Sequence, residues 1–167
     1  MATAINTFIP LFTPDINKKD IEAVAEVIQS GMLVQGKMVA ALEQKTCSYI
    51  GCRHAIAVSS GTATLHLMLH VLGIGKGDEV IIPAFSYIAT ANVVELVGAK
   101  PVFVDIDLNT FNINPNQIEE KITDKTKAIM PVHEFGLPAN MERILALGMK
   151  HNIPILEDAA CAIGSSW

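Results

Sequence analysis

The stretch Glu79-Val80-Ile81-Ile82-Pro83-Ala84-Phe85-Ser86-Tyr87 decides the fold class of this chain. It opens an apolar run from Ile81 to Ala99 that is almost long enough to span a membrane. Four residues interrupt the run: Pro83, Ser86, Asn92 and Glu95. A buried strand followed by a buried helix explains it more economically than a transmembrane helix. We therefore predict a strand over Glu79 to Ile82 and a helix over Ser86 to Val97.

The same alternation of strands and helices continues on both sides of this stretch. Short apolar runs predict five strands: Ala55 to Val58, Glu79 to Ile82, Pro101 to Asp105, Ala128 to Val132 and Ile153 to Leu156. Helical segments separate them: Thr62 to Leu72, Ser86 to Val97, Pro115 to Ile122 and Ala139 to His151. This order favours the α/β class, with a mainly parallel sheet and helices on both faces. No linker or repeat interrupts it, so we expect one domain.

Two further helices are predicted before the first strand. Apolar residues spaced from Ile21 to Ile28 indicate a helix that ends at Gly31. A second helix begins near Val39 and is expected to end at Gly51. The segment from Ile9 to Phe12 indicates an extended lead-in to both helices.

Composition limits the environment and the partners of the protein. Half of the 167 residues are apolar and only 17% are charged, against roughly 25% in a typical soluble domain. With a mean hydropathy of +0.38, part of the surface is expected to be covered by further protein or by a partner subunit. The net charge of -5, without a cluster of Lys and Arg, argues against a nucleic-acid partner.

The chain shows no sign of export or of membrane insertion. Its N-terminus lacks the basic start and long apolar stretch of a signal peptide, and no membrane partner is expected. The three cysteines form no CxxC pair, and such an odd, sparse set fits a reducing compartment. We therefore expect a cytoplasmic protein.

The segment Ser59-Ser60-Gly61-Thr62-Ala63-Thr64 joins a predicted strand to a predicted helix. The first amides of such a helix are free donors at the positive end of its dipole, where a phosphate fits. Gly61 would allow close approach, and the hydroxyls of Ser60, Thr62 and Thr64 would add donors. Taken alone, the motif is explained at least as well by a Ser/Thr helix cap without a ligand. The chain contains neither of the common nucleotide motifs, GxxxxGK[ST] and GxGxxG.

The segment Ile155-Leu156-Glu157-Asp158-Ala159-Ala160-Cys161 puts a carboxylate at the end of a buried strand. An unpaired charge is costly there, so Asp158 needs donors or a cation. A carboxylate that faces a pyridine nitrogen keeps it protonated, which lets the ring act as an electron sink. The alternative is a helix cap for the residues from Ala159 onward. Glu157 points to the opposite side of the strand and is expected to be structural.

Ligands of open α/β sheets lie outside the carboxyl ends of the strands, where both segments fall. Tyr87, at another strand end, could stack on a flat cofactor or simply pack. His133 ends a further strand, where a direct role and a hydrogen-bonded structural role explain it equally well. His66 and His70 share a helix face, but zinc would need a third ligand, so no metal is expected. A phosphate site and a carboxylate on one rim together indicate a cofactor with a phosphate at one end and a basic nitrogen at the other, and pyridoxal 5'-phosphate (PLP) is such a molecule.

These segments together resemble the DegT/StrS family of PLP-dependent sugar aminotransferases, within the fold-type I superfamily. The similar segments cover nearly the whole chain: Ile9 to Leu11, Ser30 to Gly36, Ser60 to Ala63, Gly77 to Ile81, Pro83 to Tyr87, Pro101 to Asp105, Pro131 to His133 and Glu157 to Ala160. The resemblance implies the N-terminal part of a PLP-binding large domain. Residues 1–53 would form the N-terminal helices and substrate loop, and residues 54–167 the α/β core of this incomplete large domain. The small C-terminal domain would lie outside the chain.

The resemblance also implies roles for individual residues. Thr62 and Ala63, with Gly61 beside them, would bind the cofactor phosphate. Tyr87 would stack on the ring, and Asp158 would pair with its nitrogen.

Cys161 stands where the family usually has a glutamine or histidine that hydrogen-bonds the ring hydroxyl. A thiol is a much weaker donor, so the cofactor's electronics or retention are expected to differ, unless the thiol only packs. The loop residues Leu33, Gln35 and Gly36 would lie near the sugar, and His133 on the rim is the fourth predicted substrate-binding residue.

The activity that follows from the resemblance is transfer of an amino group, with glutamate as the expected donor, to a keto group of a nucleotide-linked sugar. A homodimer with shared active sites is implied as well. The family's lysine that holds PLP covalently lies further beyond the aspartate than the nine residues that follow Asp158 here, so the chain as given lacks it. One alternative is a sugar dehydratase with histidine in place of that lysine. Another is a truncated, non-catalytic chain that binds PLP or acts as an interaction partner.

Overall fold

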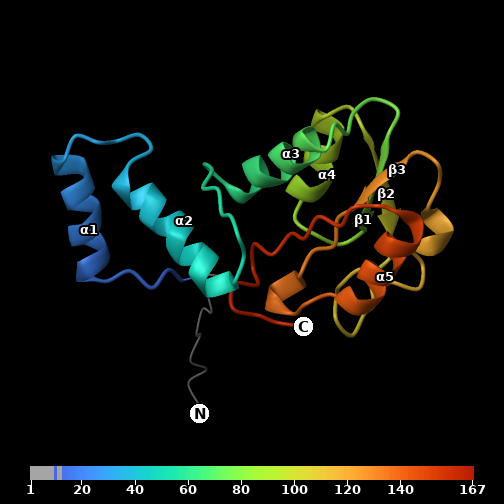
Figure 1. Cartoon of the computed structure of the whole chain (residues 1–167). Coiled ribbons are helices and arrows are strands. Elements are labelled where there is room, and N and C mark those ends of the chain that lie inside the picture. Colours follow the sequence, from blue (N-terminus) through green and yellow to red (C-terminus); the bar gives the residue numbers. More distant parts are fainter. Residues whose placement is uncertain (1–9, 11–12) are drawn as a thin grey trace, which may run out of the picture. The chain divides into compact units, whose positions relative to one another are not determined.

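The computed structural model describes residue 10 and residues 13–167 of the chain (Figure 1). The predicted lead-in from Ile9 to Phe12, which includes the similar segment Ile9 to Leu11, lies outside the described residues except for Pro10. The chain divides into two compact units between Ala57 and Val58. This division falls close to the expected boundary between residues 53 and 54, and the assignment of both parts to one large domain stays a prediction.

The first unit contains the predicted helix near residue 21, which is α1 (Lys18–Gln29). Asn17 begins it with a capping box: its side chain accepts a hydrogen bond from the amide of Lys19 at 2.9 Å, and Asp20 accepts one from the amide of Asn17 at 2.9 Å. The chain turns away at Gly31, whose φ of 71° lies in the left-handed region that favours glycine. The predicted end of this helix is therefore confirmed.

The second helix of this unit, α2 (Lys37–Ile50), ends as predicted at Gly51 with a φ of 78°. The strand expected from Ala55 to Val58 is wrong, because this segment has no strand partner among the described residues. The amide of Ala57 instead donates to a carboxylate oxygen of Glu43 on α2, at 2.9 Å. A side chain thus takes the donor that a sheet ladder would have used.

The second unit holds the sheet and the remaining helices. In chain order its regular elements are α3 (Gly61–Val71), β1 (Glu79–Pro83), α4 (Ala89–Leu96), β2 (Lys100–Val104), β3 (Thr126–Ile129) and α5 (Met141–His151), with short 3₁₀ turns η1 (Glu119–Lys121) and η2 (Glu134–Gly136). The strands are parallel in the order β2-β1-β3, with Ile81 of β1 opposite Val102 and Ile129. The α/β class with a parallel sheet is therefore confirmed.

Two predicted elements are shorter than expected. The strand from Ile153 to Leu156 is reduced to isolated parallel bridges, Ile129 to Ile155 and Val132 to Asp158, so the sheet has three full strands in the described residues. The helix from Pro115 to Ile122 is only the turn η1. There the side chain of Asn114 accepts a hydrogen bond from the amide of Asn116 at 3.1 Å, and such local bonds compete with helix formation.

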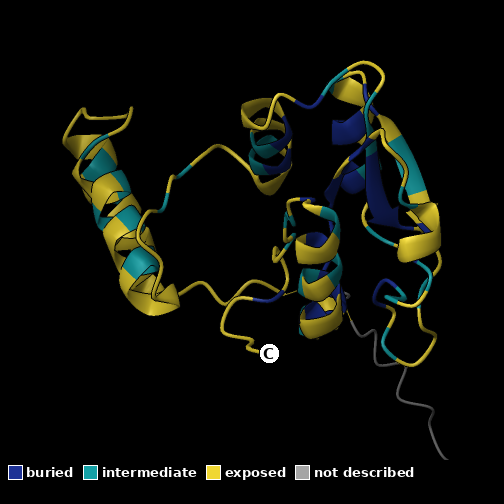
Figure 2. Ribbon diagram, turned by 45° about the vertical axis from the view of Figure 1, so that its right-hand side comes forward, coloured by how far each residue is buried: buried dark blue, intermediate teal, exposed yellow. Residues whose placement is uncertain are grey.

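The two faces of β1 bury different helices, as strand alternation requires. Val80 and Ile82 pack in one cluster with residues of α3 and α4, whereas Ile81 packs with residues of α5 on the other face. Figure 2 shows the buried residues gathered in the sheet and on the helix sides that face it. Helices therefore cover both faces, as expected.

Gly148 of α5 is buried, and a Cβ built there would lie 2.8 Å from the carbonyl oxygen of Ile153 and 2.9 Å from a side-chain carbon of Ile155. We predict that Gly148→Ala destabilises the protein by about 1–3 kcal/mol, because overpacking outweighs alanine's gain in helix propensity. Urea unfolding of the full-length protein measures this. Gly61→Ala is the matched control, since nothing lies within 4 Å of the corresponding Cβ; equal stabilities would contradict the prediction.

The carboxyl ends of the parallel strands share one edge of the sheet, and this edge is where the predicted ligand-binding residues should meet. No helix in the described part of the chain combines the length and the apolar composition needed to cross a bilayer.

Candidate functional site

The first turn of α3 begins at Ser60, which caps the helix. Its hydroxyl oxygen accepts a hydrogen bond from the amide of Ala63 at 3.1 Å. The hydroxyl of Thr64 donates back to the carbonyl oxygen of Ser60 at 3.3 Å. The amide of Ala63 and the hydroxyl hydrogen of Thr64 therefore serve the helix itself, whereas the hydroxyl of Ser60 keeps its own hydrogen for donation.

Gly61 and Thr62 are the part of this turn that stays open. Both are exposed, and among the described residues their amides make no hydrogen bond within the chain. A Cβ at Gly61 would meet nothing within 4 Å, and its φ is not left-handed, so the chain's own packing does not require glycine. Two free amides at a helix N-terminus beside an empty Cβ position fit a phosphate group.

Asp158 lies at the carboxyl edge of the sheet, half-buried. Its amide donates to the carbonyl oxygen of Pro131 at 2.9 Å, and its own carbonyl accepts from the amide of His133 at 3.0 Å. One carboxylate oxygen accepts from the amide of Ala160 at 3.2 Å. The residues that follow form turns rather than a helix, so the helix-cap hypothesis for Asp158 is wrong. The carboxylate keeps acceptor capacity for a ligand.

His133 is bonded through both ring nitrogens and is only 5% exposed. Nδ1 accepts from the amide of Ala139 at 3.1 Å, so Nε2 holds the proton and donates to Glu157 at 3.1 Å. Glu157 thus bonds to the buried ring of His133, which is consistent with the structural role predicted for it. With both nitrogens engaged, the predicted contact of His133 with substrate would need one of these bonds to open.

Glu134 lies next to His133 and was not among the residues predicted from the sequence. It is 9% exposed, and its Oε1 atom is buried without a hydrogen-bond partner in the described structure. Burial raises the pKa of this carboxyl, a hydrogen bond with Ser86 opposes the rise, and the charge of Asp158 adds to it. The signal was available, because an acidic residue directly after a buried strand end is the pattern that singled out Asp158.

The other predicted cofactor residues lie at the surface of this unit. Tyr87 is 76% exposed, just before α4, and could meet a flat ring. Cys161 is also exposed, and its carbonyl oxygen lies 3.1 Å from the position of a Cβ on Gly136. The segment before Asp158 shares a core cluster with α3, because Leu156 packs against it. Hydrogen bonds and charge interactions connect Ser86, His133, Glu134 and Asp158, but no hydrogen bond joins them to Gly61 or Thr62 among the described residues.

The predicted substrate-loop residues belong to the first unit. Leu33, Gln35 and Gly36 line a cavity of about 670 Å³ between α1 and the start of α2. Gly36 precedes α2, and a Cβ there would lie 2.8 Å from the Met32 side chain. The loop therefore borders a concave surface of its own unit.

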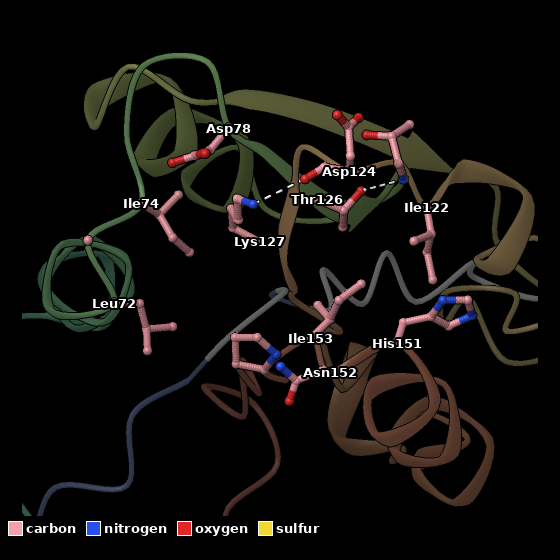
Figure 3. Close-up of a pocket in the computed structure, with 13 residues that line it drawn as sticks. Leu72, Ile74, Asp78, Ile122, Asp124, Thr126, Lys127, His151, Asn152 and Ile153 are labelled. Atoms are coloured by element: carbon pink, nitrogen blue, oxygen red, sulfur yellow. Dashed lines mark hydrogen bonds between the residues drawn. The ribbon is translucent and has the colours of Figure 1, made fainter.

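A cavity of about 790 Å³ in the second unit lies at the amino ends of the strands, whereas Asp158 lies at their carboxyl ends. Figure 3 shows residues that line this cavity. Polar residues around the amino ends of β1 and β3 line it, among them Asp78, Thr126 and Lys127. The amine of Lys127 is already bonded to the carbonyl of Asp124 at 3.1 Å. None of the predicted site residues lines it. The described residues also contain no group of three His, Cys, Asp or Glu side chains placed to hold a metal.

Comparison with known proteins gives consistent relatives. The model of the DegT/DnrJ/EryC1/StrS aminotransferase family matches residues 14–167. A UDP-4-amino-4-deoxy-L-arabinose–oxoglutarate aminotransferase of Shewanella sediminis (strain HAW-EB3) is 45% identical over 162 residues, which are 97% of this chain and 42% of that protein.

Two solved structures show the same fold. The putative sugar aminotransferase Spr1654 of Streptococcus pneumoniae, solved in PLP and PMP forms, has a TM-score of 0.90 at 34% identity, over 95% of this chain and 44% of its own. DesV of S. venezuelae, in complex with a ketimine intermediate, has a TM-score of 0.84 at 40% identity. The match covers 86% of this chain and 39% of DesV. The chain thus spans about two fifths of the length of these relatives. It belongs to the DegT/DnrJ/EryC1/StrS aminotransferase family, as its sequence motifs predicted.

Proposed function

We propose that the full-length protein is a PLP-dependent aminotransferase that moves an amino group from an amino acid, glutamate being the expected donor, to a keto group of a nucleotide-linked sugar. The observation that supports this best is the pairing of two features in a chain of this family. One is the pair of free amides at Gly61 and Thr62. The other is the half-buried carboxylate of Asp158 at the carboxyl edge of the sheet.

The donor set fits the cofactor. The Gly61 and Thr62 amides would bind its phosphate, and Asp158 would hold the proton on its ring nitrogen. Tyr87 would cover one face of the ring, and Cys161 would lie by the ring hydroxyl as a weak donor. When bound, the cofactor supplies a ring that accepts electrons during amino transfer.

The named activity of the Shewanella relative supports a nucleotide-linked sugar as acceptor, and the cavity beside Leu33, Gln35 and Gly36 would receive part of it. A homodimer is supported by the apolar side chains that α1 and α2 leave exposed, such as Ile21 and Leu42. A cytoplasmic location is supported by the sparse, odd set of cysteines.

The proposal is tested with the full-length protein, including whatever follows Trp167 in its gene. Incubation with PLP is expected to give a visible absorption band from covalently held cofactor, and glutamate should bleach it. Amino transfer from glutamate to keto derivatives of nucleotide sugars is then assayed by mass spectrometry of the product. A protein that folds but develops no such band would rule out the proposed function.

Gly61→Ala tests the phosphate site itself. We predict that the variant binds PLP about tenfold more weakly, because a methyl group would stand where the phosphate approaches the amides. Its stability should be unchanged or slightly higher, since the space around the Cβ is open and alanine favours the helix. Titration of the absorption band gives the affinity and thermal melting the stability. Weakened binding accompanied by a large loss of stability would point to misfolding instead.

A further inference from the structure

The turn that presents Glu134 is held rigidly in a backbone conformation that side chains rarely adopt. Phe135 and Gly136 have φ values of 53° and 87°, and for Phe135 this conformation costs about 1–2 kcal/mol. Asn112 offsets the cost from both ends: its side chain accepts from the amide of Glu134 and donates to the carbonyl of Leu137, each at 2.9 Å. Such strain at a fixed position is typical of functional sites.

One oxygen of the Glu134 carboxyl group lacks a hydrogen-bond donor. Glu134 Oε1 is the one buried side-chain oxygen or nitrogen without a partner that the described structure contains. Buried polar atoms in native proteins are almost always hydrogen-bonded, so an orphan acceptor indicates a missing donor. The carboxylate of Asp158 cannot supply it, because an ionised carboxylate only accepts hydrogen bonds, and its negative charge raises the pKa of Glu134 further.

We propose that Glu134 is a second acidic residue of the cofactor site and acts, beside Asp158, on the ring nitrogen of bound PLP. This inference rests on the proposed function. A positively charged N–H group bound near both carboxyl groups would relieve the repulsion between their charges. An ionised Glu134 therefore strengthens the hold on a protonated ring, whereas a neutral Glu134 leaves that task to Asp158 alone.

The other polar groups around Glu134 cannot take over its proposed role beside the ring nitrogen. His133 precedes it in the chain, but its ring is bonded to the amide of Ala139 and to Glu157. The hydroxyl oxygen of Ser86, which lowers the pKa of Glu134, lies 3.0 Å from the hydroxyl oxygen of Thr90. Asp158 is thus the charged group whose interaction with Glu134 the protonated ring nitrogen would change.

The empty protein provides the first measurement. Because burial raises the folded-state pKa of Glu134 above its ordinary 4.5, the protonated form is favoured on folding. The stability that the protonated carboxyl contributes is fully present below the ordinary pKa of 4.5. It is lost as the pH rises through the raised pKa of the folded protein. Glu134→Gln, which never ionises, should therefore melt about 2–4 °C above wild type at pH 7 and equal to it near pH 4. An equal melting temperature at both pH values would show that Glu134 is not buried as a carboxyl.

Cofactor binding by the full-length protein tests the role. In wild type the affinity for PLP should rise with pH as Glu134 ionises. In Glu134→Gln this pH-dependent rise should be absent, so the variant should bind PLP about fivefold more weakly than wild type, or weaker still, at pH 8. Glu134→Asp, which keeps the charge, should restore part of the step. Glu120→Gln, which removes an exposed carboxylate on η1, is the matched control and should behave as wild type.

The outcomes separate the two proposals. If wild type binds PLP and Glu134→Gln shows the same affinity and pH dependence, the role of Glu134 is wrong and the proposed function stands. If the folded wild type binds no PLP at any pH, both are wrong.

Discussion

Asp158→Asn in the full-length protein is expected to lower the rate of amino transfer about 10²- to 10³-fold, the range seen when one group that stabilises developing charge is removed. Asparagine is nearly the same size but has no charge, so it cannot keep the ring nitrogen of the cofactor protonated. Its side-chain oxygen can still accept the hydrogen bond from the amide of Ala160. The fold should therefore remain, and the loss should appear in turnover rather than in stability.

The measurement is the single-turnover rate of amino transfer from glutamate, with circular dichroism to check folding. Asp124→Asn is the matched control, because Asp124 lies at the amino edge of the sheet, away from the proposed cofactor site. A turnover of Asp158→Asn close to that of wild type would remove the proposed role of Asp158 at the ring nitrogen.

The second large effect is expected in the core that supports the proposed phosphate site. Leu69 of α3 is 0% exposed and packs in the cluster that includes Val80 and Val93. We predict that Leu69→Ala destabilises the protein by about 2–5 kcal/mol, the sum of lost burial and an incompletely filled cavity. Because α3 begins with Gly61 and Thr62, a loosened helix should also weaken PLP binding.

The control lies on the same helix. Leu67 is 46% exposed, and Leu67→Ala should change stability by less than about 0.5 kcal/mol. Both variants have the same chemistry and nearly the same helix propensity, so urea unfolding compares burial directly. Equal losses in the two variants would mean that the sheet-facing side of α3 has been misassigned.

Local pattern determined much of the fold. Glycines with left-handed φ ended α1 and α2 where the sequence placed those ends, because few other residues adopt this conformation cheaply. The apolar run through Ile81 was predicted to be a buried strand. In the structure Ile81 packs against α5 on one face of the sheet, and Val80 and Ile82 pack against α3 and α4 on the other. These features depend on residues close in the chain, so a sequence without any alignment is enough to find them.

The elements that the sequence predicted wrongly depend on partners elsewhere in the chain. A strand exists only where another strand takes its backbone bonds, and the segment from Ala55 to Val58 has no such partner in the described part of the chain. The helix expected after Pro115 shortened to η1, where the side chain of Asn114 bonds to the backbone. Apolar composition alone does not distinguish these outcomes.

Some features of the candidate site could be found from the sequence, and others only from the structure. The motif around Gly61 and the acidic strand end at Asp158 were recognisable from residue type and position, and they led to the family that comparison confirmed. What only the tertiary structure decided is which groups are free. It showed that Ser60 occupies the amide of Ala63 and that both nitrogens of His133 are taken. It also left Glu134 with a buried, unpaired oxygen, because hydrogen-bond satisfaction depends on which distant segments folding brings together.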